Sequence, residues 1–303
     1  MTGTPLIPIS LSLVEQDLPA AAQALGEAFA HTGFAIISEH GIPELLVSAA
    51  SGAMKALFAM PPAAKAAYAC SQGFQRGYTP FGKEIAKTGR APDLKEFWHV
   101  GREGVPGLPV NIWPREWPLF RPAMLALFEA LDDVGRRLLR AVAVHLGLAP
   151  AFFDDAIRDG NSVLRLLHYP PLMGGEGPAI RAAAHEDINV ITLLLGAEEA
   201  GLQLLGRNGQ WQDINAPPGT LVCNIGDMLQ RLTGGRLPST THRVINPPPE
   251  QQGWARWSMP YFLHFRPDYL IETMAGGPQH WPPITARDYL DERLREIGLL
   301  SRD

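Results

Sequence analysis

Three side chains of metal-ligand type lie in two apolar segments of the sequence. His185 and Asp187 belong to the run 184–195, whose β-branched and apolar residues favour a strand. Alternate residues of a strand point to the same face, so the imidazole and the carboxylate are expected side by side. His242 begins a second short apolar segment. Two imidazoles and one carboxylate are the ligand set of non-haem Fe(II) sites, whose open positions admit a chelating cosubstrate and O2.

Arg256 and Ser258 supply a different kind of site. They follow His242 in an alternating run that extends to Phe265, so they are expected to share one face of a strand. A planar guanidinium beside a hydroxyl is suited to binding a carboxylate through two hydrogen bonds. The sequence thus combines a metal-ligand set with a carboxylate-binding pair.

These motifs, in this order, resemble those of the isopenicillin N synthase-like family of Fe(II)/2-oxoglutarate-dependent oxygenases. The likeness extends over about residues 33–265 and includes the segments 33–37, 40–43, 76–78, 93–96, 169–171 and 224–229. It implies an enzyme that uses Fe(II), O2 and 2-oxoglutarate as cosubstrate. The expected reaction is hydroxylation or a related C–H oxidation of a small organic metabolite, with release of succinate and CO2.

The resemblance also implies roles for single residues. His185, Asp187 and His242 would hold Fe(II). Arg256 and Ser258 would bind the carboxylate of 2-oxoglutarate that is remote from the metal, and Tyr169 would donate a hydrogen bond to it. Asn224 is expected to orient a metal ligand.

Four further residues are candidate substrate contacts: Asn189, which continues the face of His185 and Asp187; Phe262 and His264, which continue the face of Arg256; and Arg165, which shares a strand face with Tyr169. A hydrogen-bonding role for Asn189 and a structural carboxylate as the partner of Arg165 stay open. Phe81 and Phe97 are weaker candidates, for which core packing is favoured.

Three alternative functions fit part of the pattern. Isopenicillin N synthase itself carries an Arg-x-Ser pair that binds its peptide substrate, so an oxidase independent of 2-oxoglutarate remains possible. A zinc hydrolase uses the same ligand types, but it needs a nearby general base and has little use for Arg256. A jelly-roll binding protein without catalysis is the third alternative.

The periodicity predicts the elements that position these residues. Helices are expected over 17–31, 43–60 and 119–148, and strands over 163–169, 188–195, 202–205, 211–214, 220–224, 243–246 and 256–265. Many short strands with Gly and Pro turns indicate an antiparallel jelly roll, also called a double-stranded β-helix. Thr285 and Asp288 resemble a capping box that begins a C-terminal helix. The fold class is therefore α+β, mainly β.

We divide this single integrated unit into four parts. They are an N-terminal α/β region at 1–118, buttressing helices at 119–158, the jelly-roll catalytic core at 159–270, and a C-terminal helix at 271–303.

Composition narrows the classes of partner. The 303 residues are 46% apolar, enough for a sizeable core, and carry 26 basic and 31 acidic side chains. The net charge of −5, without a basic run, argues against nucleic acid binding. No leader features and no run of about 18 apolar residues are present, so we expect a cytoplasmic protein that does not bind membranes. The expected partner is a small-molecule substrate; the oligomeric state is not predicted.

Overall fold

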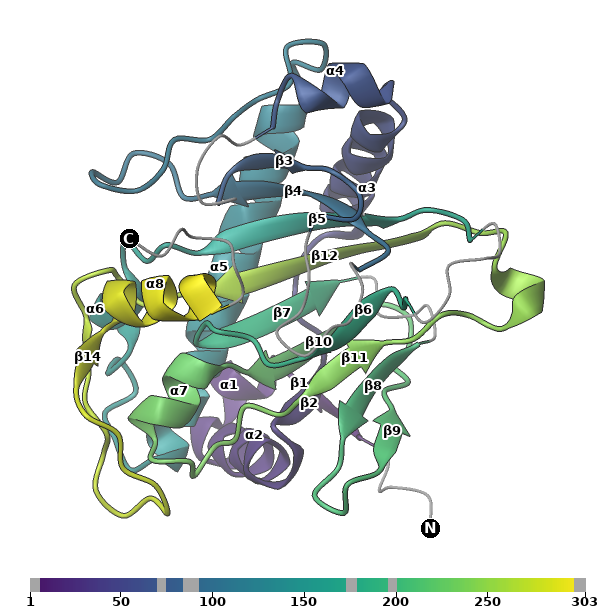
Figure 1. The fold of residues 1–303 in the computed structure, drawn as a ribbon. Helices are drawn as coiled ribbons and strands as arrows, with labels where there is room; N and C mark the ends of the chain where they lie inside the picture. The colour runs from purple at the N-terminus through teal and green to yellow at the C-terminus, as the bar shows by residue number, and fades with distance from the viewer. Residues whose placement is uncertain (1–5, 70–74, 84–92, 173–178, 196–200, 297–303) are drawn as a thin grey trace.

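Two facing sheets form the core of the computed structural model, which describes residues 6–69, 75–83, 93–172, 179–195 and 201–296 (Figure 1). The large sheet has the order β1 (Pro8–Ser10), β2 (Phe34–Ser38), β10 (Leu221–Ile225), β7 (Ile191–Leu195), β12 (Arg256–Leu263), β5 (Val163–Tyr169), β4 (Glu96–Gly101) and β3 (Gly77–Thr79). The small sheet has the order β6 (Ala182–His185), β11 (His242–Val244), β8 (Leu202–Leu205) and β9 (Trp211–Asp213). Neighbouring strands are antiparallel except β1 and β2.

The strands from β5 to β12 alternate between the two sheets, apart from the hairpin of β8 and β9. This connectivity is the predicted jelly roll, which is confirmed. Phe34, Leu202, Val222 and Val244 lie in an apolar cluster that joins the two sheets. The space inside the jelly roll therefore has the large sheet on one side and the small sheet on the other.

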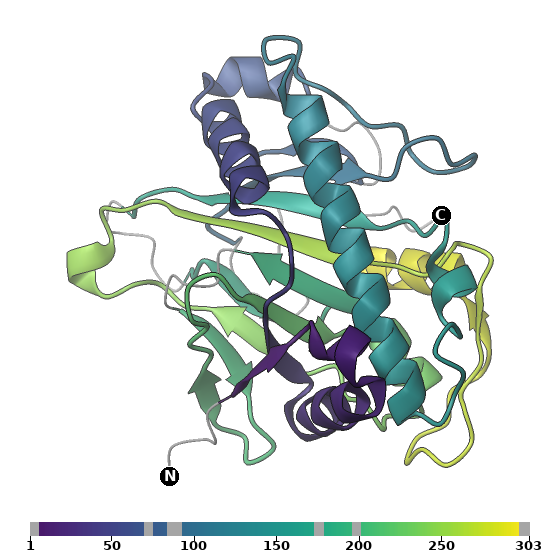
Figure 2. The same cartoon turned by 180° about the vertical axis from the view of Figure 1, so that it is seen from behind.

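Helices cover the other face of the large sheet (Figure 2). The long α5 (Phe120–His145) runs across that face and packs against α2 (Leu18–Thr32) and α3 (Glu44–Phe58). At Gly135 the helix approaches β12 closely, because an added Cβ would lie 2.5 Å from a methyl carbon of Leu263. The largest apolar core lies between these helices and the sheet, and it fixes the strands that carry the candidate site.

Shorter elements complete the fold: α1 (Leu13–Gln16), α4 (Pro62–Ala66), α6 (Asp154–Ile157), α7 (Asp227–Leu232), a 3-10 turn (Pro249–Gln251), β13 (Leu270–Ile271), β14 (Ile284–Thr285) and α8 (Ala286–Glu296). The predicted capping box is confirmed, since the Asp288 backbone N–H donates to Thr285 Oγ1 at 3.1 Å. Among the residues that the structure describes, no helix is long and apolar enough to cross a membrane.

One predicted strand is wrong in its extent. The run 184–195 is not continuous, because His185 is the last residue of β6 and β7 begins only at Ile191. Residues 186–190 connect the two sheets, and their carbonyls bond to α7 instead of to a strand: Asp227 N–H donates to Asp187 O at 2.7 Å and Met228 N–H to Asn189 O at 3.1 Å. Helix α7 itself was not predicted.

A buried ion cluster ties the large sheet to the helical layer. Lys65 Nζ donates to both carboxylate oxygens of Glu96 at 2.9 and 2.8 Å, and the Tyr78 hydroxyl and His168 Nδ1 also contact this carboxylate. His168 in turn stacks on Trp257, with ring centroids 4.1 Å apart. Burial alone would raise the pKa of Glu96, but the hydrogen bonds from His168, Lys65 and Tyr78 together hold it below its usual value.

Replacing Glu96 by Gln should destabilise the protein in a pH-dependent way. The variant leaves Lys65 buried without a carboxylate, which costs about 3–5 kcal/mol at neutral pH. Because the pKa of Glu96 is lowered in the folded protein, its ionised carboxylate stabilises the fold at pH values above the unfolded-state pKa. The difference in free energy of unfolding between wild type and variant should therefore shrink as the pH falls through the folded-state pKa of Glu96. Urea denaturation between pH 3 and pH 8 measures both effects.

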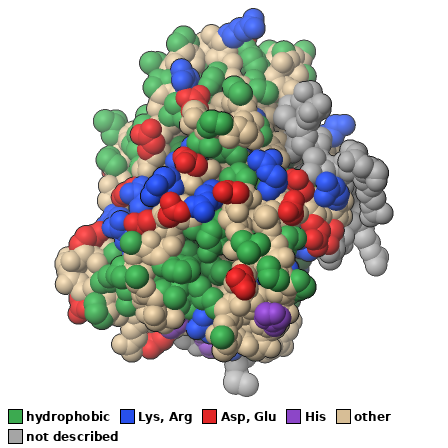
Figure 3. All heavy atoms as spheres, turned by 90° about the vertical axis from the view of Figure 1, so that its left-hand side faces the viewer, with side chains coloured by type: hydrophobic (Ala, Val, Ile, Leu, Met, Phe, Trp, Pro, Cys, Tyr) green, Lys and Arg blue, Asp and Glu red, His purple; other side chains and the backbone are tan. Residues whose placement is uncertain are grey.

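Glu103→Gln is the matched control, because Glu103 pairs with Arg121 at the surface. Exposed ion pairs contribute at most about 1 kcal/mol to the free energy of unfolding. Charged side chains of both signs are common at the surface, as on the face where α6 and α8 lie (Figure 3). A pH-independent loss in Glu96→Gln, or an equal loss in the control, would contradict the role given to the buried cluster.

Candidate active site

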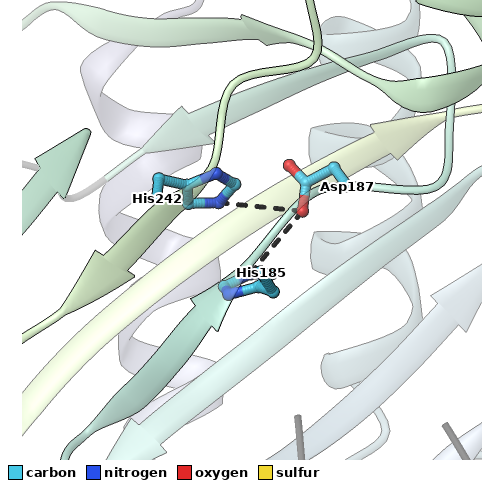
Figure 4. Close-up of side chains that lie close together, drawn as sticks. All are labelled: His185, Asp187 and His242. Atoms are coloured by element: carbon cyan, nitrogen blue, oxygen red, sulfur yellow. Dashed lines mark ion pairs between the residues drawn. The ribbon is translucent and has the colours of Figure 1, made fainter. Parts of the chain in front are cut away.

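His185, Asp187 and His242 converge on one point between the sheets (Figure 4). His185 ends β6 and His242 begins β11, and these two residues are register partners in the small sheet. Asp187 lies in the connection to β7. Its Oδ1 is 3.8 Å from Nε2 of each imidazole, and the three ligand atoms lie within 4.8 Å of one another. Such a donor set fits a single transition-metal ion.

Backbone carbonyls fix the orientation of both imidazoles. His185 Nδ1 lies 2.7 Å from Ala183 O, and His242 Nδ1 lies 3.2 Å from Thr240 O. A carbonyl only accepts, so each Nδ1 carries the proton and each Nε2 presents its lone pair to the common point. The edge of Phe34 also packs against His242, with ring centroids 5.5 Å apart. The imidazoles are therefore oriented as ligands before any metal binds.

The carboxylate of Asp187 is oriented by two side-chain donors. Thr192 Oγ1 donates to Oδ2 at 2.6 Å and Asn224 Nδ2 donates to the same oxygen at 2.8 Å, which turns Oδ1 towards the imidazoles. The connection that carries Asp187 is packed against the residue before α7: a Cβ on Gly226 would lie 2.2 Å from Asn189 O. Glycine is the residue that permits this close approach.

The electrostatics of the site favour the ligating protonation states. Burial lowers the pKa of His185 to about 4, and the neighbouring His242 and Lys95 act in the same direction, so its imidazole is neutral at neutral pH. Burial alone would raise the pKa of Asp187, but the two imidazoles and the donors Asn224 and Thr192 lower it. The carboxylate is therefore ionised when the imidazole is neutral.

A cavity extends from these three residues along the inner face of β12 and β5. Arg256, Ser258 and Tyr169 line it, as the alternation of the two strands predicts. Arg256 is 1% exposed, with Nη1 at 3.4 Å from Ser258 Oγ and the guanidinium carbon 5.2 Å from the centre of the Tyr169 ring. Arg256 and Tyr169 are also register partners. The cavity thus holds a metal-ligand set and a buried guanidinium.

The four predicted substrate contacts divide into two groups. Phe262 and Arg165 line the cavity. Asn189 does not: it is buried in the connection, and its Nδ2 donates to Ile191 O at 2.6 Å, because the chain leaves the strand before this residue. His264 is also buried and does not line the cavity, because β12 ends at Leu263. Burial and the nearby Arg76 lower the pKa of His264 to about 4.

Two residues of the site were missed in the sequence. Thr192 continues β7 and bonds Asp187, and Lys95 lines the cavity while its Nζ bonds Asp93 Oδ2 at 2.8 Å. The signal available in the sequence was the pair of opposite charges at Asp93 and Lys95, two residues apart and just before β4. Of the weaker candidates, Phe97 packs beside Arg165 and Phe81 is half-exposed.

Comparison with known proteins gives the same class as the site geometry. Residues 160–265 match the model of the 2OG-Fe(II) oxygenase superfamily, and residues 4–118 match the N-terminal model of the non-haem dioxygenases in morphine synthesis. The 2-oxoglutarate-Fe(II) type oxidoreductase HxnY of Emericella nidulans is 32% identical over 88% of this chain and 81% of its own.

Solved structures agree with this match. A 2OG-Fe(II) oxygenase family protein from Caulobacter crescentus is 48% identical, covers 98% of this chain and 100% of its own, and superposes with a TM-score of 0.90. A full-length Neurospora crassa protein, solved with alpha-ketoglutarate and thymine, is 28% identical with a TM-score of 0.86, over 97% of this chain and 98% of its own.

This chain belongs to the 2OG-Fe(II) oxygenase superfamily. It is an Fe(II)- and 2-oxoglutarate-dependent oxidoreductase with the jelly-roll core of that superfamily. The His-Asp-His set of the structure fits the iron that these enzymes use.

Thr192→Val should weaken Fe(II) binding without disturbing the fold. The change keeps the shape of the side chain but removes one of two donors to Asp187 Oδ2, and loss of such a partner lowers metal affinity about 10- to 100-fold. Anaerobic metal titration followed by calorimetry measures the affinity. Thr79→Val is the control, because Thr79 is buried on β3 and its hydroxyl makes no hydrogen bond to any residue that the structure describes. Equal affinities in wild type and Thr192→Val would contradict this role.

Proposed function

We propose that this protein oxidises a C–H bond of a small organic metabolite, with Fe(II) held by His185, Asp187 and His242. Arg256, Ser258 and Tyr169 bind the remote carboxylate of 2-oxoglutarate. The observation that carries this proposal is one continuous cavity lined by both sets. When bound, the iron and 2-oxoglutarate supply the oxidising power: O2 is reduced, 2-oxoglutarate is decarboxylated to succinate and CO2, and the substrate C–H bond is oxidised.

Arg256 is placed to fix the position of 2-oxoglutarate. Its guanidinium is buried away from water, and a charge-assisted contact is stronger in such surroundings than at the surface. The ring of Tyr169 and the hydroxyl of Ser258 limit the directions in which the guanidinium can point. A carboxylate bound here directs the other end of the same molecule along the cavity towards the metal ligands.

The remaining lining separates this chemistry from solvent. Phe34, Leu194, Leu202, Val222 and Val244 contribute apolar surface to the cavity. An apolar wall disfavours water beside the reacting atoms and strengthens the electrostatic contacts inside. The side chains of the two sheets thus position both ends of 2-oxoglutarate and keep competing water away.

The alternatives are less well supported. A zinc hydrolase requires a general base, yet Asp187 is the sole carboxylate among the described residues that line the cavity, and it is already turned to the imidazoles. The relatives named as 2-oxoglutarate-dependent enzymes, and the likeness to the Neurospora crassa protein solved with alpha-ketoglutarate, support 2-oxoglutarate over a peptide as the partner of Arg256. The same relatives support an enzyme over a jelly-roll binding protein without catalysis. Placement in the isopenicillin N synthase-like branch rests on the order of its motifs.

A small molecule as substrate is supported by the position of the cavity between the two sheets and by the ligands of a relative. The Neurospora crassa protein was solved with thymine and with 5-formyluracil, and this chain is similar to it along 97% of its length. The cavity of this chain lies between two sheets and is lined by side chains from both of them. These features favour one small metabolite over a polymer.

Arg256→Leu should weaken 2-oxoglutarate binding at least about 30-fold, because a buried charged partner is lost. Ser258→Ala should weaken it only about 2- to 10-fold, as expected for one neutral hydrogen bond. Isothermal titration of 2-oxoglutarate into the Fe(II)-loaded protein under anaerobic conditions measures both.

Arg231→Met provides the matched control, since Arg231 also lies over aromatic rings, those of Trp281 and Tyr289, but outside the cavity lining. Undiminished binding of 2-oxoglutarate by Arg256→Leu would contradict the assigned carboxylate site.

A further inference from the structure

The junction between α2 and β2 lies beside the metal ligands although it is far from them in the sequence. Gly33 ends α2 with a positive φ of 74°, and Phe34 begins β2 and is 1% exposed. The junction belongs to the segment 4–118, whereas all three metal ligands belong to the segment 160–265, which matches a different family model. Contacts between the junction and the ligands therefore join two separate parts of the chain.

The ring of Phe34 limits the tilt of the His242 imidazole. The two rings make a T-shaped contact, with centroids 5.5 Å apart and planes at 79° to each other. His242 Nδ1 lies 3.2 Å from Thr240 O, whereas His185 Nδ1 lies 2.7 Å from Ala183 O. The longer hydrogen bond holds its ring less firmly, because 3.2 Å is near the upper limit for such a bond. Packing against Phe34 therefore contributes more to the orientation of His242 than its backbone acceptor alone can supply.

The backbone that precedes His242 is packed against Gly33. A Cβ at position 33 would lie 2.5 Å from Pro238 O and 2.5 Å from Thr240 Oγ1. Glycine satisfies both the positive φ and this close approach. Because Thr240 O accepts the hydrogen bond from His242 Nδ1, a larger residue at position 33 would displace the acceptor that orients the imidazole.

The junction is also paired with the strand that supports Asp187. Phe34 and Asn224 are register partners in β2 and β10, and Ile225 N–H donates to Gly33 O at 2.9 Å. Asn224 Nδ2 in turn donates to Asp187 Oδ2 at 2.8 Å. Two adjacent residues of the junction thus contact the supports of two metal ligands, one beside the small sheet and one in the large sheet.

We propose that Gly33 and Phe34 are positioning residues of the metal centre. They hold His242 in the orientation in which its Nε2 faces Asp187 Oδ1, 3.8 Å away. The N-terminal segment thereby completes a metal site whose ligands all come from the jelly roll. The proposal rests on the proposed function, because it takes His185, Asp187 and His242 as the metal ligands.

The test measures metal affinity and ligand geometry together. Co(II), which binds the same ligand types, is titrated calorimetrically into the metal-free protein, and its visible d–d bands report the coordination geometry at saturation. Phe34→Leu keeps an apolar side chain but removes the ring. It should shift these bands and weaken Co(II) binding about 10-fold, the lower end of the loss expected when a group that orients a metal ligand is removed.

Phe120→Leu is the matched control for that variant. Phe120 is also 1% exposed, and its ring packs against Trp98 and Trp113, outside the cavity lining. The same chemical change in an equally buried position should leave both the affinity for Co(II) and the d–d bands as in wild type.

Gly33→Ala is a second, independent variant, with Gly147→Ala as its control. Gly147 follows α5 with a φ of 77°, and a Cβ there would meet no atom within 4 Å among the described residues. Both changes strain the backbone alike, but only Gly33→Ala presses on Thr240. Gly33→Ala should therefore weaken Co(II) binding about 10-fold, and Gly147→Ala should not.

Circular dichroism establishes that each variant is folded, and the Phe34 and Gly33 variants are judged separately if one of them is not. The proposal is overturned if the folded variants bind Co(II) with wild-type affinity and unchanged bands. It is equally overturned if the controls lose as much affinity, because the effect would then be general destabilisation. Failure of wild type to bind Co(II) is a separate result, and it contradicts the metal ligands of the proposed function instead.

Discussion

The orientation of one buried carboxylate is the constraint on which the site depends. Asp187 must present Oδ1 to two imidazoles although it stands outside any strand. Two donors hold its other oxygen, and the backbone of its connection is bonded to the start of α7. A buried carboxylate is unfavourable unless hydrogen bonds and positive charge surround it. The same donors that make its burial tolerable also determine where its ligating oxygen points.

The two sheets contribute differently to the site. The small sheet places the imidazoles, since His185 and His242 are register partners at its end. The large sheet places the side chains that we propose to bind 2-oxoglutarate, because Tyr169 on β5 and Arg256 on β12 are register partners that line the cavity. Helix α5 and the cluster around Glu96 hold the outer side of these strands. The distance between metal ligands and carboxylate sites is therefore set by rigid strand pairing rather than by loops.

The sequence predicted the part of the site that lies in regular strands. Alternation placed Arg256 with Ser258 on a face of one strand and Arg165 with Tyr169 on a face of another, and the structure brings these four into one cavity. It placed Asn189 wrongly, since the chain turns between sheets and the period of two no longer holds there. His264 was misplaced because it follows the end of β12.

Other features depend on contacts between segments that are far apart in the sequence. The periodicity of a single strand cannot predict such contacts. Helix α7 is only six residues long, and it forms where Gly226 can approach the connection that carries Asp187. The bond from Asn224 to Asp187 likewise joins residues that are far apart in the sequence. Jelly-roll connectivity was predicted from the number of short strands and their turns, whereas the pairing order of the outer strands was not.

The most direct test of the account is an anaerobic titration of 2-oxoglutarate into Fe(II)-loaded protein, followed in the visible range. The account predicts a charge-transfer band from keto-acid chelation in wild type and no band in Asp187→Ala, which lacks the carboxylate ligand. Absence of the band in wild type at saturating 2-oxoglutarate, or an undiminished band in Asp187→Ala, would contradict it.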